Sequence, residues 1–476
     1  MLRWRVLIVL ALVLLSGCTA QAPAASPPGP ETPQAYQLVS RPDLRPPRIS
    51  IRTAEAGLDP GYVFLMVRFS DREKGDPQAY AVVVDRTGEL VWTKRFDDDG
   101  TFPNDLAVQT YRGQPVITYW RGASEEQGWA NGEYVLLDSR YREVATVAGG
   151  NGYHADFHDL EITPRGTAYV LSYPTVRGNE EVREGVIQEV DIDTGKVLFE
   201  WHSIDHIGLE ESAAPAPEEN EAFDYFHINS VDEGPDGDLL VSARHTKAIY
   251  RIDRATGEVE WTMGGSHSDF DLGEGVEFGW QHDARWHSDG RISLLDNASN
   301  LDDQGPPSRA LTLEVDEDER TAEIASEYES PDELTSGSQA NHQLLPSGNS
   351  VVGWGSRPAF TAFAPSGEIL LHGTLPQDTF SYRAVLAEWA GEPDGSPAAV
   401  VRDSKVYVSW NGATEVREWR LLTGDSEGEM AEAAVSPRTG FETAIDLPDD
   451  AAYVAVEAVD DQGNAIGRSG VTSAER

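Results

Sequence analysis

The chain of 476 residues contains one cysteine, Cys18, so no disulfide can form within it. Long hydrophobic runs are also lacking, and the longest, at residues 6–15, is too short to span a bilayer as a helix. Positive charge is scarce, with 37 Lys and Arg against 81 Asp and Glu and a net charge of -44. Because nucleic-acid binding requires clustered Lys and Arg against phosphates, this balance argues against nucleic acid as a partner.

The N-terminus has the pattern of a bacterial export signal. Arg3 and Arg5 precede the apolar run, which favours a secretory signal peptide over residues 1–17. The run ends in Leu15-Ser16-Gly17-Cys18, which resembles the lipobox of bacterial lipoproteins, where Cys18 would carry the lipid. A plain cleaved signal with an incidental cysteine is the alternative. Residues 18–47 are rich in Ala, Pro and Ser and indicate a disordered tether. We therefore expect an extracytoplasmic protein that is attached to the bacterial cell membrane by lipid only.

A hairpin pattern recurs through most of the chain, with two alternating strands around a turn rich in Asp, Thr and Gly. Glycine supplies the positive φ that such turns require, and the full ligand ladder of a calcium loop is missing, so we interpret them as ordinary turns. Trp92, Trp201 and Trp261 recur at one position of the pattern, which favours packing between repeats over a stacking platform. The six hairpins span residues 82–92, 134–147, 189–201, 250–261, 311–324 and 360–371.

A second hairpin precedes each of these, which makes a four-stranded repeat. Six such repeats predict an all-β fold with a six-bladed β-propeller at residues 48–375. Residues 376–476 alternate differently and predict a small β-sandwich of fibronectin type III or Ig-like kind, without a concentration of reactive side chains. The inner hairpins span residues 104–119, 158–173, 227–243, 282–296 and 342–354, with 62–69 as an incomplete first member.

The inner hairpins predict the functional site, because innermost strands line the central channel and their starts rim one mouth. Four of them open with a histidine: His158, His227, His282 and His342. Asn229 lies two residues after His227 and faces the same way along a strand, and Arg244 returns toward His227 at the end of the partner strand. Imidazoles, an amide and a guanidinium together suit an anionic, oxygen-rich group.

These residues resemble the bacterial and fungal arylsulfotransferase family. The matching segments are His227-Ile228-Asn229-Ser230, Ser242-Ala243-Arg244, Trp261-Thr262-Met263-Gly264-Gly265 and Gln281-His282-Asp283-Ala284-Arg285. The resemblance implies a six-bladed propeller that transfers a sulfuryl group from an aryl sulfate to a phenol through a sulfated histidine, by ping-pong kinetics. It assigns the nucleophile to His282, sulfate binding and acid–base catalysis to His227 and Arg244, a further active-site role to His158 and a substrate contact to Asn229.

The chemistry is consistent with these roles, because a neutral imidazole is a nucleophile at neutral pH and cationic donors stabilise the sulfuryl oxygens. His227 or His158 would exchange the proton of the phenol. Asp283 is not expected to orient His282, because neighbouring residues in a strand point to opposite faces unless a bulge intervenes. We also expect Arg285 and His342 to contribute to substrate binding. The remaining histidines are interpreted as surface or loop residues: His202, His206, His245, His267, His287 and His372.

Several alternatives stay open. His154, Asp156 and His158 could hold a metal, although we predict no metal and no other cofactor. A non-catalytic ligand-binding propeller lipoprotein would keep the histidines for structure. A quinoprotein-type dehydrogenase would share Trp-bearing repeats, but it would use more blades, a calcium site and often adjacent cysteines. The expected partners are small aromatic sulfate esters and phenols, and the sequence leaves the oligomeric state undetermined.

Overall fold

The computed structural model describes residues 35–70, 77–126, 128–177, 181–218, 221–300 and 305–474. The expected signal peptide and Cys18 lie outside these residues. The expected tether ends before residue 47, because Tyr36, Leu38 and Leu44 are buried in a core cluster of the first and last blades. The Tyr36 hydroxyl also donates to the carbonyl of Gly88 over 3.0 Å. Among the described residues, no helix is long and apolar enough to cross a bilayer.

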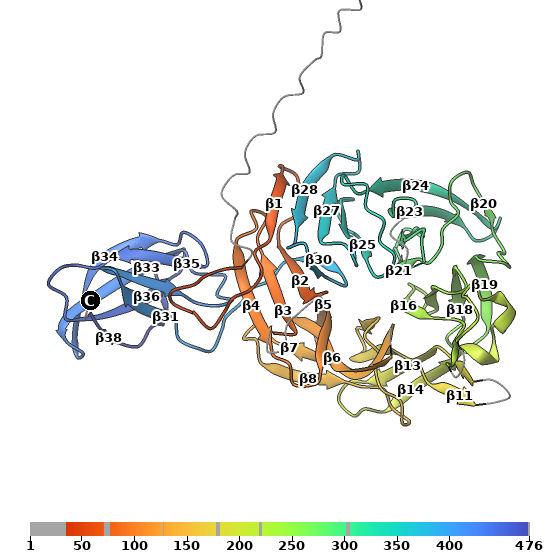
Figure 1. Ribbon diagram of the computed structural model, residues 1–476, viewed down its shortest axis with the longest axis horizontal. Coiled ribbons are helices and arrows are strands. Elements are labelled where there is room, and N and C mark those ends of the chain that lie inside the picture. Colours follow the sequence, from red (N-terminus) through yellow and green to blue (C-terminus); the bar gives the residue numbers. More distant parts are fainter. Residues whose placement is uncertain are drawn as a thin grey trace, which may run out of the picture. The chain divides into compact units, whose positions relative to one another are not determined.

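Six sheets stand around a common centre in the described chain and form the six blades of a β-propeller (Figure 1). The first three blades comprise β2 (Tyr62–Phe69), β3 (Ala79–Val84) and β4 (Leu90–Phe96); β5 (Phe102–Tyr111), β6 (Gln114–Glu126), β7 (Trp129–Leu137) and β8 (Glu143–Val147); and β9 (Leu160–Ile162), β10 (Thr167–Ser172), β13 (Val186–Asp191) and β14 (Val197–His202).

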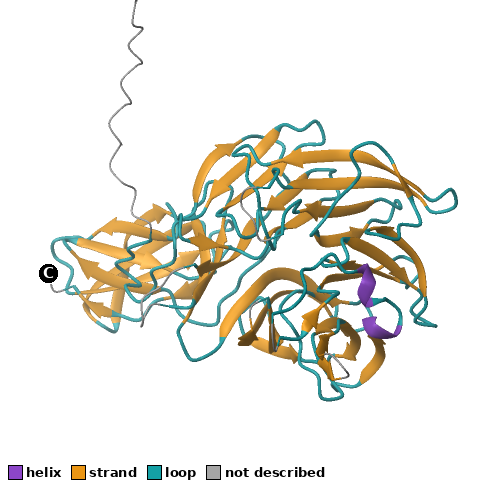
Figure 2. Ribbon diagram, turned by 45° about the vertical axis from the view of Figure 1, so that its right-hand side comes forward, coloured by secondary structure: helices purple, strands orange, loops and turns teal. Residues whose placement is uncertain are grey.

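The last three blades comprise β16 (Ile228–Glu233), β17 (Leu239–Ala243), β18 (Ala248–Ile252) and β19 (Val259–Gly264); β20 (Asp271–Leu272), β21 (His282–Trp286), β22 (Ile292–Asp296), β23 (Arg309–Asp316) and β24 (Thr321–Glu329); and β25 (Asn341–Leu344), β26 (Ser350–Gly353), β27 (Ala359–Phe363), β28 (Ile369–Thr374) and β1 (Ser50–Ala54). Strands dominate the view of Figure 2, which also shows the short 3-10 helices η1 (Ser203–Asp205) and η2 (Leu209–Glu211). A small sheet beside them contains β11 (Thr175–Arg177), β12 (Glu181–Arg183) and β15 (Phe223–Asp224).

The ring is closed by residues 379–387, which the sequence pattern assigns to the C-terminal module. β29 (Thr379–Phe380) and β30 (Ala384–Ala387) both pair antiparallel with β2, and β30 also contacts β5 of the second blade. The first blade therefore takes its innermost strand from the far end of the propeller sequence. This explains why the hairpin at 62–69 looks incomplete, and it extends the propeller beyond residue 375.

Packing between blades uses the recurrent tryptophans, as expected. The Trp201 indole N–H donates to the carbonyl of Gly257 in the next blade over 3.0 Å. Trp92 stacks on Tyr141 of the second blade at 4.9 Å between ring centroids. The turns are ordinary Asp turns, because the Asp85 carboxylate accepts from the backbone N–H and hydroxyl of Thr87. Trp92 and Trp201 therefore serve packing between blades, and Asp85 stabilises its own turn.

An ionic layer crosses the centre of the propeller and fixes the starts of the inner strands. Arg383 donates to Asp105 at 2.7 Å and lies 3.0 Å from Asp159 and 3.4 Å from Asp283. Arg285 lies 2.8 Å from both Asp159 and Asp283. Because buried cations are stable only when they are paired, these contacts hold four blades together at the axis.

The C-terminal residues form a β-sandwich with its own core. Val406 and Val408 from one sheet pack with Trp419, Leu421 and Val456 from the other. One sheet contains β31 (Ala398–Arg402), β32 (Lys405–Ser409) and β35 (Glu442–Asp446), and the other contains β33 (Glu418–Ser426), β34 (Glu429–Pro437), β36 (Tyr453–Val459), β37 (Ala465–Arg468) and β38 (Thr472–Ser473).

Candidate active site

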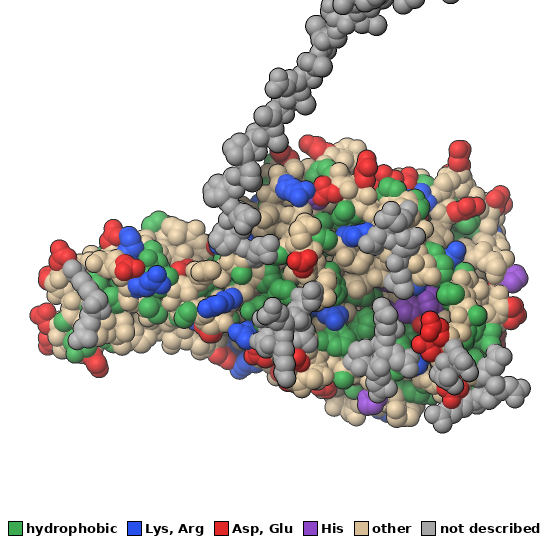
Figure 3. Space-filling model, in the orientation of Figure 1, with side chains coloured by type: hydrophobic (Ala, Val, Ile, Leu, Met, Phe, Trp, Pro, Cys, Tyr) green, Lys and Arg blue, Asp and Glu red, His purple; other side chains and the backbone are tan. Residues whose placement is uncertain are grey.

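A cavity of about 1010 Å³ lies where the inner strands begin. His158, His227 and His282 line it together with Arg244, so the structure brings four of the expected site residues to one place. Histidine side chains gather within a small area of the face shown in Figure 3. The convergence follows from the fold, because equivalent positions of successive blades point to the same axis.

His282 opens β21, and its ring is held by a neutral amide. The distance between His282 Nδ1 and Asn297 Oδ1 is 2.7 Å, while the backbone N–H of Gln339 lies 3.2 Å from Nε2. A bulge does occur between His282 and Arg285, and Asp283 adopts a φ of 58° there. The Asp283 carboxylate nevertheless binds Arg285 and the backbone N–H of His342, and it does not orient His282.

Burial keeps the imidazole of His282 neutral. Desolvation holds its pKa well below the ordinary value, and the charge of Arg244 acts in the same direction. The same two causes, together with His158, lower the pKa of His227 well below its ordinary value. Both rings are therefore neutral bases at neutral pH.

Each of the other two expected histidines is paired with a carboxylate. His227 Nδ1 lies 2.6 Å from Asp224 Oδ2, and His158 Nδ1 contacts Asp156 Oδ1. The two imidazole rings are 5.0 Å apart between centroids. A carboxylate on Nδ1 orients the ring and stabilises it when the other nitrogen takes a proton. These pairs can therefore exchange protons with a group in the cavity.

Arg244 is a buried cation without a carboxylate partner among the described residues. Its Nη2 donates to Asn300 Oδ1 at 2.9 Å and to the carbonyl of Gly337 at 3.0 Å, and Nη1 donates to His245 Nε2 at 3.0 Å. Its Nε has no hydrogen-bond partner within the described part of the chain. Desolvation lowers the pKa of Arg244 to about 10. A cation that is held in this way lacks a counter-anion.

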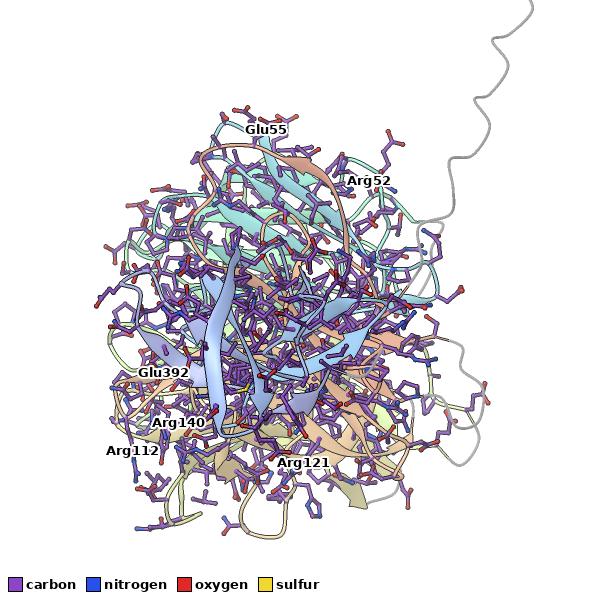
Figure 4. All side chains as sticks on the ribbon, turned by 90° about the vertical axis from the view of Figure 1, so that its left-hand side faces the viewer. Arg52, Glu55, Arg112, Arg121, Arg140 and Glu392 are labelled. Atoms are coloured by element: carbon purple, nitrogen blue, oxygen red, sulfur yellow. The ribbon has the colours of Figure 1, made fainter. Side chains whose placement is uncertain are left out.

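Other arginines show the contrasting arrangement. Four that Figure 4 labels on the surface each pair with a carboxylate: Arg52 with Asp332, Arg112 with Asp193, Arg121 with Glu133 and Arg140 with Asp394. With acidic residues in large excess, an arginine is readily neutralised. Arg244 lacks such a partner within the described part of the chain, so its charge is available to an external anion.

His245, which was expected at the surface or in a loop, lies in the turn between β17 and β18, and this turn places it in the lining of the cavity. Its ring packs on His227 at 4.5 Å between centroids, and desolvation lowers its pKa to about 3. Asp224, His227 and His245 lie close enough to share a metal ion. However, Arg244 can only donate, so His245 Nε2 must accept and the hydrogen of the ring lies on Nδ1. His245 Nδ1 lies 2.5 Å from the carbonyl oxygen of Asp224, to which it donates. This tautomer leaves Nδ1 no lone pair for a metal.

The other metal arrangement left open by the sequence does not form either. The side chain of His154 is exposed, whereas Asp156 is buried. The Asp156 carboxylate is occupied by His158 and by the backbone N–H of Ala130 at 2.7 Å. The segment therefore orients His158 and does not assemble three ligands.

Three expected substrate contacts lie elsewhere. Arg285 belongs to the ionic layer, and His342 is buried between the Leu311 carbonyl and the Ser350 hydroxyl. The register shift between Ile228 and Ser230 breaks the alternation on which the expectation for Asn229 depended. The Asn229 amide donates to the carbonyl of Gln281 over 2.6 Å. None of the three is among the residues that line the cavity.

Tyr382 is a cavity residue that the sequence reasoning missed. It lies two residues before β30, the innermost strand of the first blade, whereas His282 is the first residue of β21. Its hydroxyl is buried and has no hydrogen-bond partner among the described residues. Burial raises the pKa of Tyr382 well above its ordinary value, so it stays a donor.

Aromatic side chains line much of the remaining cavity. Phe102, Phe157 and Phe380 contribute to it, as does Trp129, whose ring lies 3.8 Å from the guanidinium carbon of Arg183. Phe157 stacks on His158 at 4.5 Å between centroids. The cavity therefore combines an anion-binding corner with walls that suit a planar aromatic ring.

Comparison with known proteins points in the same direction. The model of a family described as Arylsulfotransferase (ASST) matches residues 107–375. None of the curated proteins matches the chain. Similar solved structures include a protein of unknown function from Bacteroides caccae, with 14% identity, a TM-score of 0.40 and coverage of 66% of this chain and 93% of that one. The periplasmic gluconolactonase of Pseudomonas aeruginosa has 11% identity, a TM-score of 0.39 and coverage of 82% and 99%. A virginiamycin B lyase from Staphylococcus aureus has 9% identity, a TM-score of 0.35 and coverage of 76% and 97%.

Proposed function

Because the chain belongs to the arylsulfotransferase (ASST) family, we propose that it moves a sulfuryl group from an aryl sulfate to a phenol through a sulfated His282. The family makes it a transferase that acts on aryl sulfates and phenols in a broad sense. The mechanism and the residue roles that follow are our proposal. The observation that carries it is the buried Arg244, which has no carboxylate partner among the residues that the structure describes and shares a cavity with neutral imidazoles.

In the first half-reaction, the Nε2 lone pair of His282 attacks the sulfur of the bound ester. The bond between Nε2 and sulfur forms while the bond between sulfur and the aryl oxygen breaks, and the phenolate leaves with the bonding electrons. Charge on the sulfuryl oxygens is balanced by Arg244. His158, in its protonated form beside Asp156, supplies a proton to the departing oxygen, whereas His227 is neutral and can act only as a base.

The second half-reaction reverses these steps with another phenol. The same imidazole takes the phenolic proton, the phenolic oxygen attacks sulfur, and the bond between sulfur and Nε2 breaks. Free His282 is regenerated, and no other cofactor enters the proposed steps. One product leaves before the acceptor binds, so the scheme predicts ping-pong kinetics.

Donor and acceptor would use the same aromatic walls. Phe102, Phe157 and Phe380 offer apolar surface for a planar ring. The sulfuryl end would then face Arg244 and His282. A flat apolar body with one anionic end matches this division of the cavity.

The test uses 4-nitrophenyl sulfate as donor and phenol as acceptor. Release of 4-nitrophenol should be lost in His282→Ala and retained in His287→Ala. His287 is a suitable control because its Nε2 bonds the Ser293 hydroxyl and it does not line the cavity. Intact-mass analysis after exposure to donor alone should show one added sulfuryl group in the wild type and in His287→Ala.

Equal turnover in the two variants would reject His282 as the nucleophile. Binding of aryl sulfate without turnover or adduct in the wild-type protein would favour the non-catalytic ligand-binding alternative. Bound quinone absorbance in the purified protein would instead support the dehydrogenase alternative.

We also propose that the enzyme works outside the cytoplasm, held to the bacterial cell membrane by a lipid on Cys18. The support is the lipobox-like segment at residues 15–18, which lies outside the described residues. Wild-type protein expressed in bacteria should enter the detergent phase on phase separation, whereas Cys18→Ser should stay in the aqueous phase. Equal partitioning of the two would reject the anchor.

A further inference from the structure

We propose that Asn297 is the positioning residue of the nucleophile: it fixes the hydrogen of His282 on Nδ1 and thereby presents the Nε2 lone pair to the sulfuryl group. This inference rests on the proposed function for its catalytic meaning. The tautomer itself is a property of the resting protein and can be tested separately.

The orientation of the Asn297 amide follows from its other contacts. Its Nδ2 lies 2.9 Å from the carbonyl of Ser336 and 3.1 Å from the carbonyl of Gln339. A carbonyl oxygen can only accept, so the nitrogen of the amide must face these two groups. The amide oxygen is therefore the atom that faces His282, and the reversed amide would place oxygen against two oxygens.

The tautomer of His282 then follows from the partners of its two ring nitrogens. Nδ1 faces Asn297 Oδ1 at 2.7 Å and the carbonyl of Trp280 at 3.2 Å, and both of these oxygens only accept. Nε2 faces the backbone N–H of Gln339 at 3.2 Å, and this group only donates. Both sides assign the hydrogen to Nδ1 and the lone pair to Nε2. Before Nε2 can attack sulfur, the substrate must take the place of the Gln339 N–H beside it.

An amide is the partner that suits a nucleophile at this place. The carboxylates beside His158 and His227 accept from Nδ1 and would stabilise a second proton while the ring carries it, although His227 is neutral at rest. Asn297 orients His282 without adding a negative charge. Burial is the largest cause that lowers the pKa of His282, and Arg244, His158 and His227 act in the same direction, whereas the hydrogen bond with Asn297 raises it. The surroundings thus divide the three histidines into one nucleophile and two proton carriers.

The first test is nitrogen NMR of protein carrying ¹⁵N-labelled histidine, with His282→Ala used to assign the signals. We expect His282 to show a protonated Nδ1 and an unprotonated Nε2 at neutral pH. In Asn297→Ala the two shifts should move toward the average of both tautomers. A hydrogen on Nε2 in the wild-type protein would overturn the inference, whether or not the variants fold.

The second test separates positioning from general packing. Asn297→Ala should lower kcat by about 10–100-fold, the usual effect of removing a group that orients a reactive histidine, while KM for the aryl sulfate stays nearly constant. Gln343→Ala is the control, because this amide also bonds a backbone, that of Leu386, and lies outside the cavity. We expect its folded fraction to keep the wild-type kcat.

The two tests separate the positioning role of Asn297 from the proposed sulfuryl-transfer activity. Wild-type kcat in Asn297→Ala, or an equal loss in both variants, would overturn the positioning role. If the wild-type protein lacked sulfuryl transfer altogether, the proposed function would fail, whereas the NMR result would still decide which nitrogen carries the hydrogen.

Discussion

Replacement of Arg244 by methionine is expected to lower kcat/KM for an aryl sulfate by about two to four orders of magnitude. A guanidinium has five N–H donors, and Asn300, Gly337 and His245 occupy three of them. The two that remain, one of them the buried Nε–H, are left for sulfuryl oxygens. Hydrogen bonds to charged groups contribute roughly 1.5–3 kcal/mol each. Their loss therefore raises the barrier by about 3–6 kcal/mol, and each ~1.4 kcal/mol is tenfold in rate.

The same change should leave the fold as stable as the wild type or make it more stable. The lowering of the pKa of Arg244 to about 10 corresponds to a cost on the order of 3 kcal/mol for keeping the guanidinium charged in its dry surroundings. Methionine fills a similar volume without that cost. A thermal melt should show an equal or higher Tm.

The assay follows 4-nitrophenol release at several donor concentrations and reports kcat and KM separately. Arg251→Met is the matched control, because Arg251 is neutralised by Asp236, Asp238 and Glu317 and lies outside the cavity. We expect this control to lower stability without changing kcat/KM of the folded enzyme. A loss of less than about threefold in Arg244→Met, below 1 kcal/mol, would refute the assignment of this residue to the sulfuryl group.

Three other predictions concern charge and proton state. The pKa of His282 is lowered well below the ordinary value, and the ring reacts when it is neutral. On acidification, kcat/KM should therefore stay constant to about pH 6.5 and fall only at lower pH. A fall in kcat/KM that begins at or above that pH would contradict this. Arg383→Met should destabilise the fold by about 3–5 kcal/mol, because it removes the cation paired with Asp105 and one of the two cations beside Asp159 and Asp283. Denaturant titration measures this loss, and a change below ~1 kcal/mol would argue against the ionic layer. Tyr382→Phe removes a buried hydroxyl that has no hydrogen-bond partner among the described residues. The variant should lower kcat/KM by ~2–10-fold with no fall in Tm. An unchanged kcat/KM would exclude contact of this hydroxyl with the substrate.

The repeat pattern was readable from the sequence because each blade carries its own strands and turns. The outer hairpins at 189–201 and 250–261 correspond to β13–β14 and β18–β19, and Trp201 packs against the next blade as expected. A local period of apolar residues and a turn glycine are enough to predict such units. The same logic placed His158, His227 and His282 at equivalent starts, and the structure brings them together.

The contacts of Arg285 and His342 could not be read in this way. Alternation along a strand predicts the face of a side chain only where the register is regular. A bulge at the start of β21 directs the side chain of Arg285 toward Asp159 in the ionic layer. His342 lies within β25 and points into the packing between two blades. Bulges and packing between blades depend on neighbours that are distant in sequence.

The sequence by itself determined the number of blades, the C-terminal sandwich and the three histidines and one arginine of the cavity, because these follow from periods that repeat within about 50 residues. Only the tertiary structure decided that β30 closes the ring, that Tyr382 and His245 line the cavity and that Asn297 faces His282. β30 and Tyr382 reach their places through closure of the ring, which joins segments far apart in the chain. His245 and Asn297 follow the ends of β17 and β22, where the course of the backbone is not predicted by strand alternation.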